Sequence, residues 1–157
     1  MNARNVSESQ ITMTELVLPH HTNQLGNLLG GQLMHWIDIC AALSAAKHNG
    51  RICVTASVDK VDFLYPVKLG DAVTLVSSVN RVFNTSLEVG VKVFAQNFKL
   101  GTVKHTNSAY LTFVCVDSDG KPLKAAEALP ETNEQKRRFN EALIRRENRL
   151  KSRAVEK

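Results

Sequence analysis

The feature that most constrains this fold is one predicted helix that is apolar around almost its whole circumference. From Leu33 to about His48, apolar residues return at intervals of three and four, the period of an α-helix. Small and apolar side chains fill much of the remaining face, and Asp38 is the only carboxylate within it. A helix of this kind is buried on most sides. The fold must therefore supply a surface that wraps around it.

Strands supply that surface. Alternating and β-branched stretches joined by short turns predict an antiparallel sheet, with strands at residues 11–18, 52–65, 72–83, 87–95 and 104–117. The prediction is an α+β fold in which a curved antiparallel sheet wraps around one long central helix. Such a sheet leaves open edges, and open edges favour pairing with a second copy of the chain.

The end of the chain is predicted as a charged helix over residues 133–153. Its apolar residues form a narrow stripe of Phe139, Leu143, Ile144 and Leu150. Residues 131–157 contain nine Lys and Arg residues and five Glu residues, and this surplus accounts for most of the net charge of +5. Basic segments attract nucleic acid, but Phe139 is the only aromatic residue in this one, so we expect no nucleic-acid partner. Arg137, Arg138, Arg145 and Arg146 are expected on a solvated face or in contacts between subunits.

Length and composition bound the remaining classes. A chain of 157 residues with 43% hydrophobic and 22% charged residues is typical of one globular domain. We expect a flexible segment at residues 1–10, the folded domain at 11–126 and a basic helix or tail at 127–157. No run approaches the roughly 20 apolar residues of a membrane span, and the polar start lacks a signal-peptide pattern, so we expect a cytoplasmic protein without a membrane partner. Cys40, Cys53 and Cys115 lack the spacing of metal ligands, so no metal is expected.

The entrance of the central helix is the candidate site. Paired glycines, Gly30 and Gly31, allow another chemical group to approach the backbone closely. The first turn of a helix also offers unpaired N–H donors and a partial positive charge to a developing oxyanion. Asp38 further along the helix, with an asparagine upstream, completes a small hydrolytic site. The alternative is a glycine-rich helix entrance with a solvated acid, and spacing alone leaves both open.

Three segments in order resemble a known family. They are Asn23-x-x-Gly26-Asn27-x-x-Gly30-Gly31 followed by Met34-x-x-Ile37-Asp38, then SVDKVDFLYPVKLGD at residues 57–71, then TSLEV at residues 85–89. These segments resemble the hotdog-fold acyl-CoA thioesterases, in particular the cytosolic acyl-CoA hydrolase group with its brain-type enzyme and short bacterial relatives. The likeness covers about residues 11–126, and the arginine-rich C-terminal helix also fits.

The resemblance implies a hotdog fold and hydrolysis of a fatty acyl-CoA to a free fatty acid and coenzyme A, with no cofactor or metal. It also implies a homo-oligomer, with a dimer as the catalytic unit and a trimer of dimers as the assembly. In the family an Asn and an Asp from different subunits form the active site, and by motif position these are Asn27 and Asp38. Gly31 is the expected oxyanion donor. An ionised Asp38 would act as general base or as nucleophile, and the sequence leaves both routes open.

The resemblance also implies which residues contact the coenzyme A part of the substrate. The pantetheine arm of coenzyme A is expected beside Gly30, Val58, Asp59 and Phe63, and the adjacent Thr85 and Ser86 are candidate donors to it. Many relatives have Gly-Arg or Gly-Lys before that pair, whereas this chain has Phe83 and Asn84. Arg81 or Lys104 is the candidate replacement for a phosphate contact there.

Other functions fit less well. A hotdog hydratase or dehydratase typically needs a His with a carboxylate at the helix, which the Asn27 and Asp38 arrangement does not provide. His20, His21 and His35 are interpreted as loop and helix-surface residues. A non-catalytic acyl-CoA sensor on the same fold is the main alternative, although the ten residues before the first strand are too few for a helix-turn-helix. Acyl chain length, regulation and pathway are not readable from the sequence.

Overall fold

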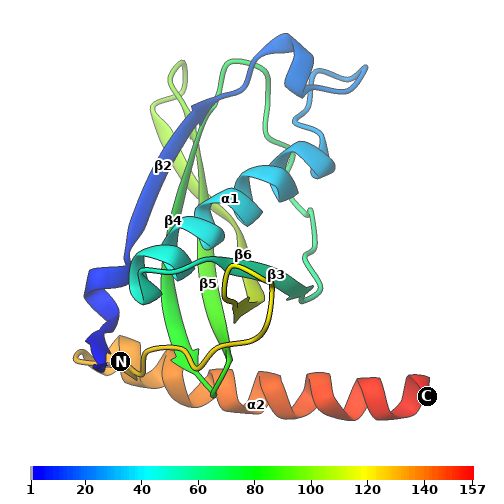
Figure 1. Cartoon of the computed structure of the whole chain (residues 1–157). Helices are drawn as coiled ribbons and strands as arrows, with labels where there is room; N and C mark the ends of the chain where they lie inside the picture. Colours follow the sequence, from blue (N-terminus) through cyan, green and yellow to red (C-terminus); the bar gives the residue numbers. More distant parts are fainter. Residues whose placement is uncertain (1) are drawn as a thin grey trace.

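A five-stranded antiparallel sheet curls around the long helix α1 (Gly30–Asn49) in the computed structural model, which describes residues 2–157 (Figure 1). The strand order is β2-β4-β5-β6-β3. The strands are β2 (Ile11–Leu16), β3 (Cys53–Val58), β4 (Ala72–Val82), β5 (Ser86–Asn97) and β6 (Thr102–Cys115). The predicted arrangement of one curved antiparallel sheet around one helix is confirmed.

Helix α1 is buried because alternate residues of the strands point at it. Ile37, Cys40 and Ala41 have no exposed surface, and they pack in one core with inward residues of the sheet, including Leu75, Val89, Leu111 and Phe113. Such burial of a large apolar side chain is worth about 1.5–3 kcal/mol. The helix begins three residues before the predicted start, so Gly30 and Gly31 belong to its first turn. Its outer side still exposes two apolar residues, Ile39 and Leu43.

The strand predicted over residues 52–65 is wrong beyond Val58. β3 lies at one edge of the sheet, whereas β4 lies on the far side of β5 and β6. Residues 59–71 must therefore cross the sheet and cannot continue the strand or form a hairpin. The pairing of this edge ends just after β3, where the N–H of Asp59 donates to the carbonyl of Tyr110 at 3.0 Å, an ordinary hydrogen-bond length.

Residues 4–9, for which the sequence indicated flexibility, are packed in the structure. The short strand β1 (Arg4–Asn5) pairs in parallel with β7 (Ala128–Leu129), and a 3-10 helix, η1 (Val6–Ser9), follows it. Ser9 is fully buried, and its hydroxyl accepts a hydrogen bond from the N–H of Val79 at 2.9 Å. Val6 joins the hydrophobic core and Ser9 adds a polar contact, and so short a segment leaves no periodic signal in the sequence. The domain limits at residues 11 and 126 stay predictions.

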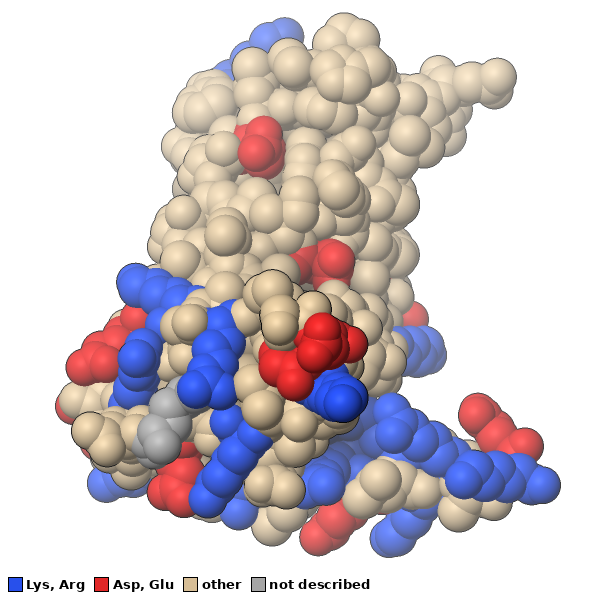
Figure 2. All heavy atoms as spheres, viewed as in Figure 1, with Lys and Arg blue, Asp and Glu red and all other residues tan. Residues whose placement is uncertain are grey.

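Helix α2 (Asn133–Glu156) runs across the ends of the strands on the opposite side of the sheet from α1, and its C-terminal end extends beyond them (Figure 1). Thr132 caps it, because its hydroxyl accepts from the N–H of Gln135 at 3.1 Å. Three of the four residues of the predicted apolar stripe, Leu143, Ile144 and Leu150, are exposed, and only Phe139 is half-buried, so the stripe contributes little to holding the helix in place. Charged side chains gather around α2, while the upper part of the molecule in the same view carries few (Figure 2).

A buried carboxylate attaches α2 to the sheet instead. Glu88 of β5 has no exposed surface and lies on the sheet face opposite α1. Arg145 donates to both of its oxygens, with Nη2 2.7 Å from Oε1, and Arg149 Nη1 lies 3.1 Å from Oε2. Asn80 Nδ2 completes the set at 3.0 Å. Arg145 was expected on a solvated face or in contacts between subunits, so its ion pair with Glu88 of the same protomer is a correction.

Replacing Glu88 tests this attachment. Glu88→Gln keeps the side-chain shape but leaves Arg145 and Arg149 without a buried counter-charge. We expect the free energy of unfolding to fall by about 3–5 kcal/mol, the usual cost of breaking a buried ion pair from one side. Urea unfolding followed by circular dichroism measures this change.

The matched control is Glu134→Gln at the start of α2, where the exposed Glu134 side chain pairs with Lys92 and Arg138. Exposed pairs contribute little, so this variant should stay within about 0.5 kcal/mol of the parent. Equal losses in the two variants would contradict the anchoring role of Glu88.

His48 gives the fold a second testable property. It is buried near the end of α1, its Nε2 lies 2.9 Å from the carbonyl of Ala126, and its Nδ1 has no partner among residues 2–157. Burial is the main cause that lowers the pKa of His48 below its ordinary value, and nearby Arg4 acts in the same direction. The folded state therefore favours the neutral ring.

The lowered pKa of His48 sets the direction in which stability changes with pH. A group with a lowered pKa in the folded state stabilises the protein above its unfolded pKa of about 6.5, and this contribution is lost as the pH falls below it. Between about pH 7.5 and 5.5 we expect a loss of about 1 kcal/mol from this residue, measured by urea unfolding. His48→Gln, which cannot be protonated, should lose less. An identical pH dependence in parent and variant would contradict the prediction.

Candidate active site

A tight turn before α1 brings two asparagines together. The side-chain oxygen of Asn23 accepts the N–H groups of Leu25 at 2.9 Å and Asn27 at 3.2 Å. The N–H of Gly26 also bonds the carbonyl of Asn23 at 3.0 Å, and Gly26 has the positive φ of 73° that favours glycine. Because its oxygen is used inside the turn, Asn23 has only its NH₂ group left to offer to a ligand.

Asn27 is held from the other side of the loop. Lys68 Nζ donates to its side-chain oxygen at 2.7 Å, and the backbones of the two residues form a β-bridge. The N–H of Leu28 then bonds the carbonyl of Val67 at 2.7 Å. These contacts fix the loop against the crossing segment of residues 59–71.

The entrance of α1 lies next to this loop. Leu29 precedes the helix and provides no side-chain cap, and the first helical bond runs from the N–H of Leu33 to its carbonyl at 3.1 Å. The N–H groups of Gly30 and Gly31 are thus left as unpaired helix-end donors. Gly31 is exposed and has open space where a side chain would begin.

A cavity of about 230 Å³ opens at this entrance. Asn23, Asn27, Gly30 and Phe63 are among the residues that line it, so the structure brings together three of the predicted site residues and adds Asn23. The Phe63 ring lies 3.6 Å from where a Cβ on Gly30 would be, so the glycine makes room for the ring. The cavity thus combines an apolar wall with amide groups.

Asp38 lies elsewhere in the same protomer. It is half-buried on α1 and accepts a hydrogen bond of 2.7 Å from the hydroxyl of Thr55, on the edge strand β3. It is two helical turns after Gly31, about 10 Å along the axis. Asp38 does not line the cavity that holds the asparagines. One protomer therefore presents the amides and the carboxylate as two separate groups.

The predicted substrate contacts fall into three places. Phe63 and Gly30 line the cavity already described. Val58 and Asp59 border a groove of about 650 Å³ between the end of β3 and α2, where Asp59 pairs with Arg149 at 2.9 Å. The third group lies at the hairpin between β4 and β5.

At that hairpin, Arg81 is engaged with α2. Its guanidinium lies 4.1 Å from the centroid of the Phe139 ring and donates to the Phe139 carbonyl at 3.2 Å. Thr85 and Ser86 are half-buried at the turn, and the carbonyl of Thr85 accepts the N–H of Cys115. Within one protomer these residues do not line the cavity with Asn27.

The cysteines and histidines take structural positions. Burial raises the pKa of Cys40, and it raises the pKa of Cys53 to about 12, so neither is a ready nucleophile near neutral pH. The His21 ring packs edge-on against Trp36 with ring centroids 4.9 Å apart, and its Nδ1 accepts the N–H of Leu18. This agrees with the interpretation of His21 as a loop residue.

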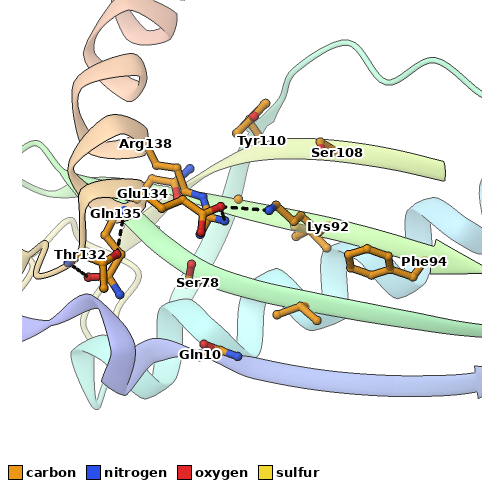
Figure 3. Close-up of a pocket in the computed structure, with 14 residues that line it drawn as sticks. Gln10, Ser78, Lys92, Phe94, Ser108, Tyr110, Thr132, Glu134, Gln135 and Arg138 are labelled. Atoms are coloured by element: carbon orange, nitrogen blue, oxygen red, sulfur yellow. Dashed lines mark hydrogen bonds and ion pairs between the residues drawn. The ribbon is translucent and has the colours of Figure 1, made fainter. Parts of the chain in front are cut away.

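A larger cavity of about 400 Å³ lies on the other face of the sheet, between the strands and the start of α2 (Figure 3). Lys92 reaches Glu134 across it at 3.2 Å, with Arg138 on the same carboxylate (Figure 3). None of the predicted site residues lines it. The smaller cavity at the entrance of α1 is therefore the candidate site.

Residues 2–157 contain no cluster of three His, Cys, Asp or Glu side chains placed to hold a metal ion. No helix among them combines the length and the apolar character needed to cross a membrane.

Comparison with known proteins gives a consistent result. Residues 25–102 match the family model of the thioesterase superfamily. The chain is 42% identical over 146 residues to the uncharacterized acyl-CoA thioester hydrolase YkhA of Bacillus subtilis, across 93% of this chain and 84% of that protein. A crystal structure of an apo-hexameric acyl-CoA thioesterase superposes with a TM-score of 0.94 at 41% identity, covering 99% of both chains.

A further relative has been solved with ligands. The acyl-CoA hydrolase of Staphylococcus aureus, in complex with butyryl coenzyme A, coenzyme A and coenzyme A disulfide, superposes with a TM-score of 0.90 at 37% identity, over 98% of this chain and 93% of that one. Variants of the S. aureus protein have been solved in which alanine replaces an aspartate, an asparagine or a threonine. With these likenesses over nearly the whole chain, the fold is the hotdog fold.

Proposed function

Because this chain belongs to the thioesterase superfamily, we propose that it hydrolyses acyl-CoA thioesters to a free acid and coenzyme A. The observation that carries the proposal is the entrance of α1. There, the first turn of α1 has unpaired N–H groups, and a cavity lined by asparagines opens beside it. The same helix carries Asp38, a carboxylate that Thr55 holds in place. Fatty acyl-CoA is the proposed substrate class, and the acyl group would lie against Phe63.

The catalytic unit would be a dimer. The amides and Asp38 are separate in one protomer, and the outer side of α1 exposes Ile39 and Leu43 beside the open edge of β3. Two β3 edges can pair through their free backbone groups. Such pairing would cover the apolar residues and would let Asp38 of one protomer face the loop of its partner. A trimer of such dimers is the proposed assembly, in line with the hexameric relative.

Gly31 would stabilise the transition state. When the thioester carbonyl is attacked, negative charge gathers on its oxygen, and a fixed N–H at a helix N-terminus stabilises that charge. The donor is already oriented by the helix and needs no reorganisation. Open space at Gly31 allows the carbonyl oxygen to approach.

Asp38 would act on the other side of the carbonyl carbon. As general base it takes a proton from water while the water oxygen bonds to the carbon. As nucleophile it forms an anhydride that water then opens. In both routes the carbon–sulfur bond breaks and the thiolate of coenzyme A leaves with the electron pair. The hydroxyl of Thr55 orients the carboxylate.

A side-chain amide would orient the water or bind the thioester carbonyl oxygen, and two asparagines are candidates for this role. The sequence motif pointed to Asn27. The spacing of the three substituted residues in the S. aureus hydrolase equals the spacing of Asn23, Asp38 and Thr55 in this chain. The side-chain oxygens of both asparagines accept hydrogen bonds, so each has its NH₂ group to offer to the carbonyl, and the spacing is what favours Asn23. We therefore assign Asn23 to the reaction and Asn27 to holding the loop.

Contacts with the rest of coenzyme A remain part of the proposal. Val58 and Asp59 lie at the groove beside α2, which also carries Lys60, Arg145 and Arg153. Arg81, Thr85 and Ser86 lie at the opposite end of the strands from the cavity, so contacts from them would serve a substrate bound by a neighbouring protomer. No cofactor enters the reaction, and coenzyme A is its product.

Three variants test the assignment together. Asp38→Asn and Asn23→Ala should each lower kcat by about a hundredfold or more, because each removes a group that acts in the transition state. Asn27→Ala should lower kcat by less than about tenfold, since its role is structural. Thiol release from acyl-CoAs of increasing chain length measures all three, with binding of coenzyme A as the control.

The results separate the alternatives. A larger loss in Asn27→Ala than in Asn23→Ala would restore the motif-based choice. Binding of acyl-CoA without thiol release at any chain length would instead favour a non-catalytic acyl-CoA sensor.

A second pair of variants tests the oxyanion donor. Gly31→Pro removes the N–H, and proline is tolerated in the first turn of a helix. Gly31→Ala keeps the N–H and places its methyl group in open space. We expect kcat to fall about a hundredfold or more in the proline variant and to stay close to the parent in the alanine variant. Equal kcat values for the two would exclude Gly31 as the donor.

A further inference from the structure

Two cysteines lie directly opposite each other on neighbouring strands. Cys53 of β3 and Cys115 of β6 are partners in the antiparallel register. The N–H of Cys115 donates to the Thr85 carbonyl at 2.9 Å, and its carbonyl accepts the N–H of Leu123 at 2.8 Å, so both groups point away from β3. Cys53 and Cys115 therefore form a non-hydrogen-bonded pair.

This type of pair has the geometry that a disulfide needs. In non-hydrogen-bonded antiparallel pairs the Cα atoms are about 4.5 Å apart and the side chains leave the sheet on the same face. Disulfides span Cα separations of about 4.4–6.8 Å. The third cysteine, Cys40, lies apart on α1, where its Sγ is 3.3 Å from the hydroxyl of Ser77.

The two sulfurs differ in access. Cys115 is fully buried, whereas Cys53 is half-buried, with its side chain on the face of β3 that meets the end of α1 and not along the edge of the sheet. Asn49 Nδ2 donates to the sulfur of Cys53 at 3.4 Å, a contact that favours its thiolate. Cys53 is therefore the thiol that an external reagent reaches first, and Cys115 is placed to react with it next.

We propose that Cys53 and Cys115 close a reversible cross-strand disulfide by exchange with a low-molecular-weight disulfide. The Cys53 thiolate attacks one sulfur of the reagent, forms a mixed disulfide and releases one thiolate. Cys115 then loses its proton to solvent and attacks the Cys53 sulfur, which releases the second thiolate. Two protein thiols are oxidised, one disulfide is reduced to two thiols, and the two protons end on those thiols.

The rate has a predictable pH dependence. Burial raises the pKa of Cys53 to about 12, so little thiolate is present at neutral pH. The exchange should be slow near pH 7 and faster in alkaline solution. One source of the reagent rests on the proposed function: thioester hydrolysis releases coenzyme A, and the oxidised form of coenzyme A is a low-molecular-weight disulfide. The placement of Cys53 opposite Cys115 does not depend on the proposed function.

The test uses the full chain and two reagents. The protein is incubated at about pH 9 with oxidised glutathione or, separately, with coenzyme A disulfide, and the remaining thiols are then alkylated in denaturant. After digestion, mass spectrometry should find peptides with Cys53 and Cys115 joined, two hydrogens lighter than the reduced pair. Only Cys40 should be alkylated, and dithiothreitol should restore alkylation of all three cysteines.

Matched variants make the result specific. Cys40→Ala should still form the link, whereas Cys115→Ala should accumulate a mixed disulfide on Cys53. Closure with either reagent supports the proposal, and the pair of reagents identifies which source reaches the site. Alkylation of all three cysteines in both arms, or a stable mixed disulfide on Cys53 beside a free Cys115 in the parent protein, would overturn it. The readout requires no turnover, so it is independent of the proposed function.

Discussion

Burial of α1 by a single sheet is the constraint on which the rest of this structure depends. A flat sheet covers one side of a helix, so the strands must bend, and the ladders show register shifts at Thr55/Ser57, Val79/Arg81 and Val93/Phe94. Bulges of this kind bend a strand and increase its twist. One of them directly follows Thr55, the residue that holds Asp38. The curvature that covers the helix therefore also shapes the strand beside the proposed catalytic carboxylate.

The other face of the sheet is organised by charge. α2 is held by arginines that meet the buried Glu88 and by stacking of Arg81 on Phe139, while its apolar residues stay largely outside. Charged contacts of this type add little net stability compared with apolar packing, but they accept only one alignment of the two partners. The same arginine that reaches Glu88, Arg149, also reaches Asp59 at the end of β3. α2 thereby couples the middle of the sheet to its edge strand.

Periodic patterns of apolar residues predicted the elements that are buried regularly along their length. The helical period of α1 and the alternation in β4, β5 and β6 were readable because burial repeats along each element. The end of β3 was not, because the position of β4 across the sheet decides it. Glu88 looks like an ordinary solvent-facing strand residue in the sequence, and only the arrival of α2 buries it.

The candidate site shows the same division. Asp38 and the glycine pair were predicted from their place on a helix. The choice between Asn23 and Asn27 is different, because both lie in the loop before the helix, both have their side-chain oxygens engaged, and no helical or strand period distinguishes them.

The strand order also governs how the chain assembles during synthesis. β2 pairs only with β4, and β3 pairs only with β6, so both N-terminal strands wait for partners made later. α1 leaves the ribosome before the three strands that form most of its covering. A nascent chain therefore carries an apolar helix without a sheet until β6 is complete, and exposed surfaces of this type promote aggregation. The hairpins β4–β5 and β5–β6, which need only short turns, are the natural first structure onto which the earlier half folds back.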